Sequence, residues 1–341
     1  MNTAVTPPAT VPVTRLGRQG PQAVSAIGLG CMGMSGMYGA SDEAQSIATI
    51  HAALDAGINL LDTGDFYGLG HNESLIGRAL KGRRDQALLS VKFGALRDPA
   101  GGFTGVDGRP ASVKNFLAYS LQRLGTDHID IYRMARLDPG VPIEDTIGAM
   151  ADLVRAGYVR YIGLSEVGVD TIRRAHAVHP VSDLQIEYSL VSRGPEAEIF
   201  PLLQALGIGV TPYGVLSRGL LAGSKTTGPG DFRAHLPRFT GDNLAQNEKL
   251  VAVLQQLAAS LGATASQVAI AWVAAQGRAF GVDMVPLVGS RTLKQLDESL
   301  GALALTLGAE DLRRIGAALP ADAVAGTRYD AFQMTHLDSE K

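Results

Sequence analysis

The chain has 341 residues, of which 46% are hydrophobic and 18% charged, and this composition excludes a disordered or fibrous protein. Its 30 Lys and Arg residues against 33 Asp and Glu residues give a net charge of −3 without a basic block, so we expect no nucleic-acid partner. The single cysteine, Cys31, excludes an internal disulfide and a thiolate metal cluster. Since no segment is apolar for the ~18 or more residues of a membrane span and no signal peptide is recognisable, we expect a cytoplasmic protein without a membrane partner.

From the N-terminus, residues 1–13 are predicted to be a disordered lead-in, followed by a short hairpin across one end of the fold. Beyond it, one joint recurs along the chain: a helical pattern, then a glycine, then a short apolar run. The glycines of these joints are Gly57, Gly82, Gly125, Gly157 and Gly207. Because glycine accepts the left-handed conformation that closes a last helical turn, each joint predicts a helix that leads into a strand. Strands that alternate with helices are typical of a parallel sheet.

Eight apolar runs are predicted to form the strands. They are Val24–Leu29, Ile58–Leu61, Ala87–Val91, Ile129–Tyr132, Val159–Leu164, Leu184–Ile186, Ile208–Val210 and Met284–Val288. Eight strand–helix units without a linker predict a single α/β domain, a (β/α)8 TIM barrel over residues 14–320, with a C-terminal tail at 321–341. A doubly wound open sheet is the alternative. The stretch Ser224–Asn243 fits neither helix nor strand and is predicted to be a mobile loop over the functional site.

A glycine pattern near the first strand resembles the phosphate-binding turn of a Rossmann fold. Gly28, Gly30 and Gly33 are spaced as G-x-G-x-x-G. In a dinucleotide-binding turn the third glycine opens a helix, whereas here the helical pattern begins only near Ser41. We therefore favour a glycine-rich loop at the mouth of a barrel.

Charged and aromatic residues follow the apolar runs, where the active sites of such barrels lie. Asp62 and Tyr67 follow "NLL", and Lys92 follows "LLSV". A buried lysine is costly unless a carboxylate compensates its charge, and Asp62 is on the neighbouring strand. We expect Lys92 to lower the pKa of the Tyr67 phenol and make it a proton donor to a carbonyl oxygen. The alternative is a structural Asp–Lys pair, with Tyr67 used for packing.

Longer motifs resemble the aldo-keto reductase family from about Thr14 to Leu305. They include "NLLDTGDFYGLGHNESLIGRALKGRRDQALLSVKFG", "VPIEDTIGAMADLVRAGYVRYIGLSE", "QIEYSL" and "VPLVGSRTLKQLDESLGAL". The resemblance implies an NADPH-dependent carbonyl reductase on a (β/α)8 barrel, with a catalytic tetrad of aspartate, tyrosine, lysine and histidine. Asp62, Tyr67 and Lys92 match three of the four positions.

The fourth position departs from the family. Relatives commonly read "YYQHRVDP" where this chain reads "YRMARLDP", so Ala135 occupies the position of the histidine. A methyl group donates no hydrogen bond and opens space for a bulkier substrate. Arg133 or Arg136 is a possible replacement donor, and the alternative for either is an ion pair with a nearby acid such as Asp138. Cys31, Ala135 and Arg133 are assigned to the substrate pocket.

The resemblance also implies where NADPH binds. Ser165 and Gln185 match positions that bind the nicotinamide carboxamide, Tyr213 matches the aromatic platform under the ring, and Glu166 replaces an asparagine of many relatives. Arg291 suits a 2′-phosphate through its bidentate fork, which favours NADPH over NADH. The remaining cofactor-binding assignments are Gly30, Met32, Leu216, Ser217, Arg218, Gly219, Gly289, Ser290, Gln295, Glu298 and Ser299.

Two functions remain open at this stage. The first is NADPH-dependent reduction of a ketone or aldehyde, and the alternative is a catalytically weakened, cofactor-binding regulatory protein on the same barrel. His176 and His179 have a metal-like spacing but no accompanying acids, so no metal is predicted. The expected partner is a small carbonyl substrate, while the sequence does not indicate which carbonyl or which oligomeric state.

Overall fold

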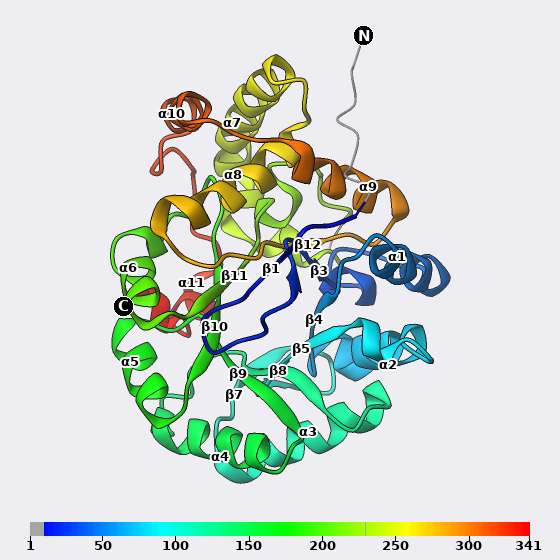
Figure 1. Ribbon diagram of the computed structural model, residues 1–341. Helices are drawn as coiled ribbons and strands as arrows, with labels where there is room; N and C mark the ends of the chain where they lie inside the picture. Colours follow the sequence, from blue (N-terminus) through cyan, green and yellow to red (C-terminus); the bar gives the residue numbers. More distant parts are fainter. Residues whose placement is uncertain (1–9, 229) are drawn as a thin grey trace.

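The computed structural model describes residues 10–228 and 230–341 (Figure 1). Most of the predicted lead-in, residues 1–9, lies outside this description. In the described part, no single helix is long and apolar enough to cross a membrane; one pair, bent by 84°, passes that test jointly by length and composition alone.

Eight parallel strands form a nearly closed barrel, which confirms the predicted (β/α)8 class over the open sheet. Their hydrogen-bonded order is β11-β10-β9-β8-β5-β4-β3-β12. Two backbone hydrogen bonds of Val210 complete the ring. Its N–H donates to the Asp283 carbonyl, and its carbonyl accepts from the Val285 N–H. The strand bounds are β3 (Gly28–Gly30), β4 (Leu60–Gly64), β5 (Leu88–Phe93), β8 (Ile129–Met134), β9 (Val159–Ser165), β10 (Val181–Glu187), β11 (Gly209–Tyr213) and β12 (Leu287–Gly289).

Helices surround the strands on the outside of the ring (Figure 1). Four of the five glycine joints are confirmed: Gly125 and Gly207 end helices with φ of 64° and 71°, and Gly57 and Gly157 follow helix-capping alanines. Gly82 does not lead directly into a strand, because a 3-10 helix at Arg84–Gln86 comes first. The helix bounds are α1 (Glu43–Asp55), α2 (His71–Ala79), α3 (Pro110–Leu124), α4 (Ile143–Arg155), α5 (Val169–Val178), α6 (Ile199–Leu206), α7 (Gly241–Ser260), α8 (Ala265–Phe280), α9 (Leu293–Gly301), α10 (Ala309–Ala318) and α11 (Ala331–Met334).

The first predicted strand is divided in two. β2 (Val24–Ser25) pairs with β1 (Val13–Thr14) in an antiparallel hairpin, and only β3 joins the barrel. This hairpin lies across the strand ring in Figure 1, where Leu16 and Val24 pack against Leu60, Ile131, Val285 and Leu287. Gly33 lies in a short 3-10 turn, and α1 begins only at Glu43, so the Rossmann alternative is wrong.

All eight barrel strands end later than their apolar runs, and two of these extensions carry charged residues of the cavity. β4 continues through Asp62 to Gly64, and β5 continues through Lys92 to Phe93. Asp62 therefore lies inside its strand rather than after it, opposite Ser90 of β5. The apolar pattern underestimates these strands because the polar side chains at their ends satisfy one another inside the barrel.

Three segments cover the carboxyl ends of the strands, and we call them the roof. They are the hairpin of β6 (Ala95–Arg97) and β7 (Phe103–Val106), residues 230–240, and the tail at 321–341. Part of the predicted loop Ser224–Asn243 is helical, so the prediction that it contains neither helix nor strand is wrong there. It contains 3-10 helices at Phe232–His235 and Pro237–Phe239 and the start of α7. Asp231 stabilises the first of these by accepting from the Arg233 amide.

An ion pair without solvent access lies inside the barrel. Arg133 and Asp183 are both 0% exposed, and Arg133 Nη1 donates to the Asp183 carboxylate at 2.8 Å. Arg133 Nη2 also donates to Ser90 Oγ, and Thr211 Oγ1 donates to Asp183. The placement of Arg133 in the substrate pocket is therefore wrong, because its side chain holds β8 to neighbouring strands from within the barrel.

Asp183→Ala should lower the free energy of unfolding by about 3–5 kcal/mol, since it leaves the Arg133 charge buried without its partner. Chemical denaturation at equilibrium measures this loss. Glu144→Ala is the control, because Glu144 pairs with Arg174 where both side chains are exposed, and its unfolding midpoint should hardly move. Equal midpoints for the two variants would contradict a stabilising role for the interior pair.

Candidate active site

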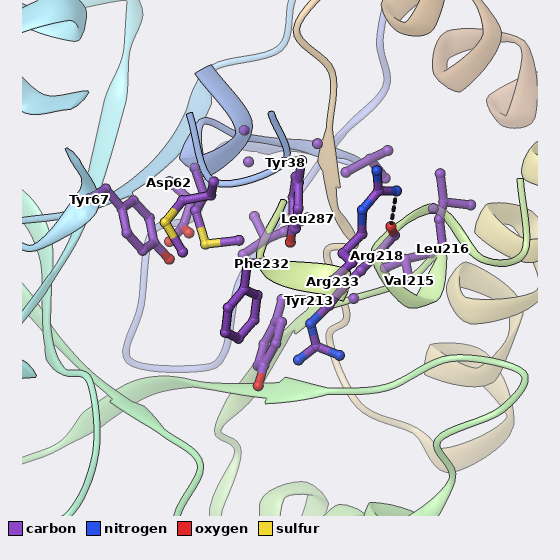
Figure 2. Close-up of a pocket in the computed structure, with 18 of the residues that line it drawn as sticks. Tyr38, Asp62, Tyr67, Tyr213, Val215, Leu216, Arg218, Phe232, Arg233 and Leu287 are labelled. Atoms are coloured by element: carbon purple, nitrogen blue, oxygen red, sulfur yellow. Dashed lines mark hydrogen bonds between the residues drawn. The ribbon is translucent and has the colours of Figure 1, made fainter. Parts of the chain in front are cut away.

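A cavity of about 350 Å³ opens at the carboxyl ends of the barrel strands and extends beneath the roof. Figure 2 shows its two ends: Tyr67 and Asp62 lie at one, Arg218 and Leu216 lie at the other, and Tyr213 and Phe232 lie between them. Residues from all eight barrel strands or the loops that follow them line the cavity, as expected for the functional face of such a barrel.

A buried pair of opposite charges forms the floor of the first end. Lys92 Nζ donates to the Asp62 carboxylate, which also accepts from Ser90 Oγ and from Gln185 Nε2, each at 2.8 Å. Both side chains are less than a tenth exposed. Burial lowers the pKa of the Lys92 ammonium, and the charge of Asp62 acts in the opposite direction. The predicted pairing is thus present, and Asp62 keeps a cation at this position.

Tyr67 faces this pair from the loop after β4. Lys92 Nζ lies 5.1 Å from the centroid of its ring, and the tyrosine is 8% exposed. Burial raises the pKa of the Tyr67 phenol well above its ordinary value of 10.0, and the charge of Asp62 raises it further. The expectation of a lowered pKa is therefore wrong, because burial and the charge of Asp62 outweigh the effect of the Lys92 ammonium. The phenol stays protonated at neutral pH, which suits a proton donor.

The middle of the cavity has a polar atom without a partner. Ser165 Oγ is buried and makes no hydrogen bond within the described part of the chain. Gln185 Nε2 is held by Asp62, which leaves its carbonyl oxygen as an acceptor. Tyr213 lies beside them at the end of β11, with its hydroxyl 3.1 Å from that of Tyr329. A donor and an acceptor next to an aromatic face fit a planar ring that carries an amide, such as nicotinamide.

The other end has cations and glycines. Arg218 Nη2 donates to Glu187 at 2.9 Å, while its Nη1 is buried and has no partner among residues 10–228 and 230–341. Arg291 Nη1 donates to the carbonyl oxygens of residues 38–40, and its amide donates to the Gln295 side chain. Ser165 and Arg218, which carry the unpartnered donors, therefore line one cavity together with Arg291, as a ligand that carries both an amide and phosphates would require.

The structure places most of the assigned residues in the cavity lining and excludes three. Cys31 is fully buried, with Sγ turned to the Leu29 carbonyl at 3.7 Å. The Ser217 side chain is buried 3.5 Å from Arg238, and Arg133 lies in the barrel interior. The lining residues are Gly30, Met32, Asp62, Tyr67, Lys92, Ala135, Ser165, Gln185, Tyr213, Leu216, Arg218, Gly219, Gly289, Ser290, Arg291, Gln295, Glu298 and Ser299.

Roof residues that the sequence analysis did not assign also line the cavity. Phe103 from the hairpin and His336 from the tail have ring centroids 5.3 Å apart, so these two segments meet over the catalytic end. The local sequence pattern does not predict this contact. The only feature of the sequence that could have indicated it is the presence of aromatic and histidine residues in the tail. The lining residues of the roof are Ala95, Arg97, Phe103, Phe232, Arg233, Tyr329, Gln333, His336 and Leu337.

A buried ion pair holds the tail in place. Arg328 donates both terminal nitrogens to Glu166, at 2.9 and 2.7 Å, and Ser339 Oγ donates to the same carboxylate. Burial would raise the pKa of the Glu166 carboxyl, but Arg328 holds it well below its usual range. The Glu166 side chain therefore binds the tail.

Comparisons with known proteins agree with this geometry. The sequence profile of the Aldo/keto reductase family matches residues 26–320. A protein described as probable aldo-keto reductase 1, from Glycine max, is 42% identical over 329 residues, which cover 94% of this chain and 92% of that protein. The structure of glycerol dehydrogenase AKR11B4 from Gluconobacter oxydans has a TM-score of 0.79 at 27% identity and covers 92% of this chain and 97% of its own. An aldo/keto reductase from Klebsiella pneumoniae, solved with NADP and acetate, has a TM-score of 0.72 at 25% identity, covering 93% and 98%.

Arg328→Ala should release the tail, because Glu166 would then be buried without its cation. Hydrogen exchange followed by mass spectrometry should show peptides from residues 327–341 exchanging at least about tenfold faster, with the barrel strands unchanged. Arg313→Ala, which breaks an exposed pair with Glu310 on α10, is the control. Unchanged protection of the tail in Arg328→Ala would show that its other contacts suffice.

Proposed function

This chain belongs to the aldo/keto reductase family, and on that premise we propose that it uses NADPH to reduce a ketone or aldehyde to an alcohol, with Tyr67 as the proton donor. One observation carries the proposal: a protonated phenol and a buried Asp62–Lys92 pair face the same cavity as the unpartnered Ser165 hydroxyl. A phenol beside a site suited to nicotinamide supports the assignment of Tyr67 as the acid.

Ser165, Gln185 and Tyr213 would hold the nicotinamide of NADPH, which when bound would supply the hydride that the carbonyl carbon accepts. Tyr67 gives its phenolic proton to the carbonyl oxygen, so the product is an alcohol and the tyrosine becomes a phenolate. Lys92, whose ammonium lies 5.1 Å from the ring centroid, stabilises that phenolate until solvent returns the proton. Asp62 is a positioning residue, since it holds Lys92 in place through their hydrogen bond.

Ala135 affects this reaction because its side chain has no hydrogen-bond donor. Its side chain donates no hydrogen bond to the developing oxyanion, and such donors typically contribute about 2.7–4 kcal/mol. Arg133 does not replace the missing group, because its guanidinium is committed to Asp183. Small aldehydes should therefore react slowly, while the space beside the methyl group accommodates larger ketones.

The preference for NADPH rests on Arg291. Its guanidinium lines the cavity and has no carboxylate partner among the described residues, which suits a 2′-phosphate. The relative from Klebsiella pneumoniae was solved with NADP, which supports the same cofactor here.

Ala135 also favours the second candidate, a regulatory protein that binds the cofactor without turnover. Against it stands the buried Lys92 beside Tyr67, for which a purely cofactor-binding protein has no evident use. Turnover assays distinguish the two functions, since only the reductase oxidises NADPH in the presence of a carbonyl compound.

Tyr67→Phe should lower the turnover of any accepted carbonyl by about two to four orders of magnitude, since the ring remains and the proton donor is lost. Steady-state NADPH oxidation gives the rate, and a fluorescence titration checks that the cofactor still binds. A rate within a factor of about three of the wild-type rate would assign proton donation to another group.

Arg291→Ala should weaken NADPH binding by about 1.5–3 kcal/mol and leave NADH binding nearly unchanged, because only NADPH carries the 2′-phosphate. Fluorescence titration of both cofactors measures the two affinities. Lys294→Ala is the control, since Lys294 is exposed on the neighbouring helix and does not line the cavity. Equal losses for both cofactors would instead mean that Arg291 acts by holding residues 38–40.

A further inference from the structure

The cavity has more positive charge than its own carboxylates neutralise. Six cations line it: Lys92, Arg97, Arg136, Arg218, Arg233 and Arg291. Lys92, Arg218 and Arg233 form ion pairs with Asp62, Glu187 and Asp231. The other three form no ion pair within the described residues, and Arg291 lies at the end assigned to the cofactor phosphates. Arg97 and Arg136 therefore remain near the catalytic end.

Arg136 is the better placed of these two. Its Nη1 donates to the Ala135 carbonyl at 2.6 Å, and its Nη2 donates to the Tyr329 hydroxyl at 3.3 Å. Both partners are neutral, and the expected partner Asp138 instead accepts from the amides of Gly108 and Gly140. A guanidinium has five N–H donors, so several of them remain available to a ligand in the cavity.

Arg97 lies beside two aromatic rings, whereas Arg136 has one such contact, with its guanidinium carbon 5.8 Å from the centroid of the Tyr329 ring. The guanidinium carbon of Arg97 lies 5.4 Å from the centroid of the Phe66 ring and 5.9 Å from that of Phe103. Its Nε is buried without a partner among the described residues. These contacts partly compensate the charge and leave less of the guanidinium open to a ligand than in Arg136.

Arg136 also lies beside the reacting position. It follows Ala135 directly, and its charge opposes the rise of the Tyr67 pKa, so the arginine and the phenol act on the same part of the cavity. Tyr329 links it to the nicotinamide side, since its hydroxyl contacts both Arg136 and Tyr213. Glu166, a buried acid after β9 whose charge acts on Arg136, is bound by Arg328.

We propose that the substrate carries a carboxylate as well as the reacting carbonyl, and that Arg136 binds this carboxylate. The proposal rests on the reductase function proposed above. A planar guanidinium matches a carboxylate through two parallel hydrogen bonds, and the anion neutralises a cation that the protein leaves unpaired. The alanine at position 135 provides the space through which the anion reaches the arginine.

The test compares charged and neutral forms of one aldehyde. The wild-type enzyme is assayed with NADPH on 3- and 4-formylbenzoate and on their methyl esters. The value of kcat/KM for the better carboxylate should exceed that of its ester by about tenfold or more, although the ester is the more electrophilic aldehyde. In Arg136→Gln this ratio should fall to within about twofold, mainly through KM for the carboxylate.

Other results would overturn the proposal. A wild-type ratio near one, with measurable reduction of both forms, would reject the carboxylate and leave the reductase function intact, whereas no reduction of any carbonyl would reject the reductase function itself. Loss of the preference in Arg97→Gln but not in Arg136→Gln would move the anion site to the hairpin. A rise in the NADPH dissociation constant of Arg136→Gln as large as the change in ratio would place Arg136 on the cofactor.

Discussion

Lys92 has a positive charge at the buried end of a barrel strand, and the residues at the catalytic end of the cavity are arranged so that a carboxylate neutralises this charge. An ammonium in this position is stable only with a carboxylate against it, which Asp62 supplies from the neighbouring strand. The remaining acceptor capacity of that carboxylate is used by Ser90 and Gln185. Gln185 is thereby held with its carbonyl oxygen free, so a single ion pair orients both the acid-base machinery and a group suited to the cofactor.

Two further buried ion pairs lie below and above the cavity. Below the cavity, Arg133 and Asp183 form an ion pair with no solvent access, and Ser90 connects this pair to Asp62 through its hydroxyl. Above the cavity, Glu166 and Arg328 fasten the tail to the end of β9. Each pair ties segments distant in sequence, because a buried charge tolerates few positions other than beside its partner.

The roof forms part of the cavity wall. The family profile ends at residue 320, whereas Tyr329, Gln333 and His336, which lie in the tail beyond it, line the cavity. Relatives that share the barrel therefore need not share this wall. Glu166 and Ala135 belong to the same region: the first holds the tail, and the second is a small residue directly before Arg136.

Local patterns in the sequence determined the barrel and three residues of the site. Glycines after helices and short apolar runs are local signals, and parallel strands bring their carboxyl ends together, which is enough to place Asp62, Tyr67 and Lys92 in one cavity. The sequence predicted the Asp62–Lys92 pair, whereas only the tertiary structure decided the other two buried pairs. Arg133 and Asp183 are 50 residues apart, Glu166 and Arg328 are 162 apart, and the raised pKa of Tyr67 depends on burial by the roof and on Asp62. Charge pairing and desolvation depend on distances through space, and a pattern of neighbouring residues carries no information about those distances until the chain has folded.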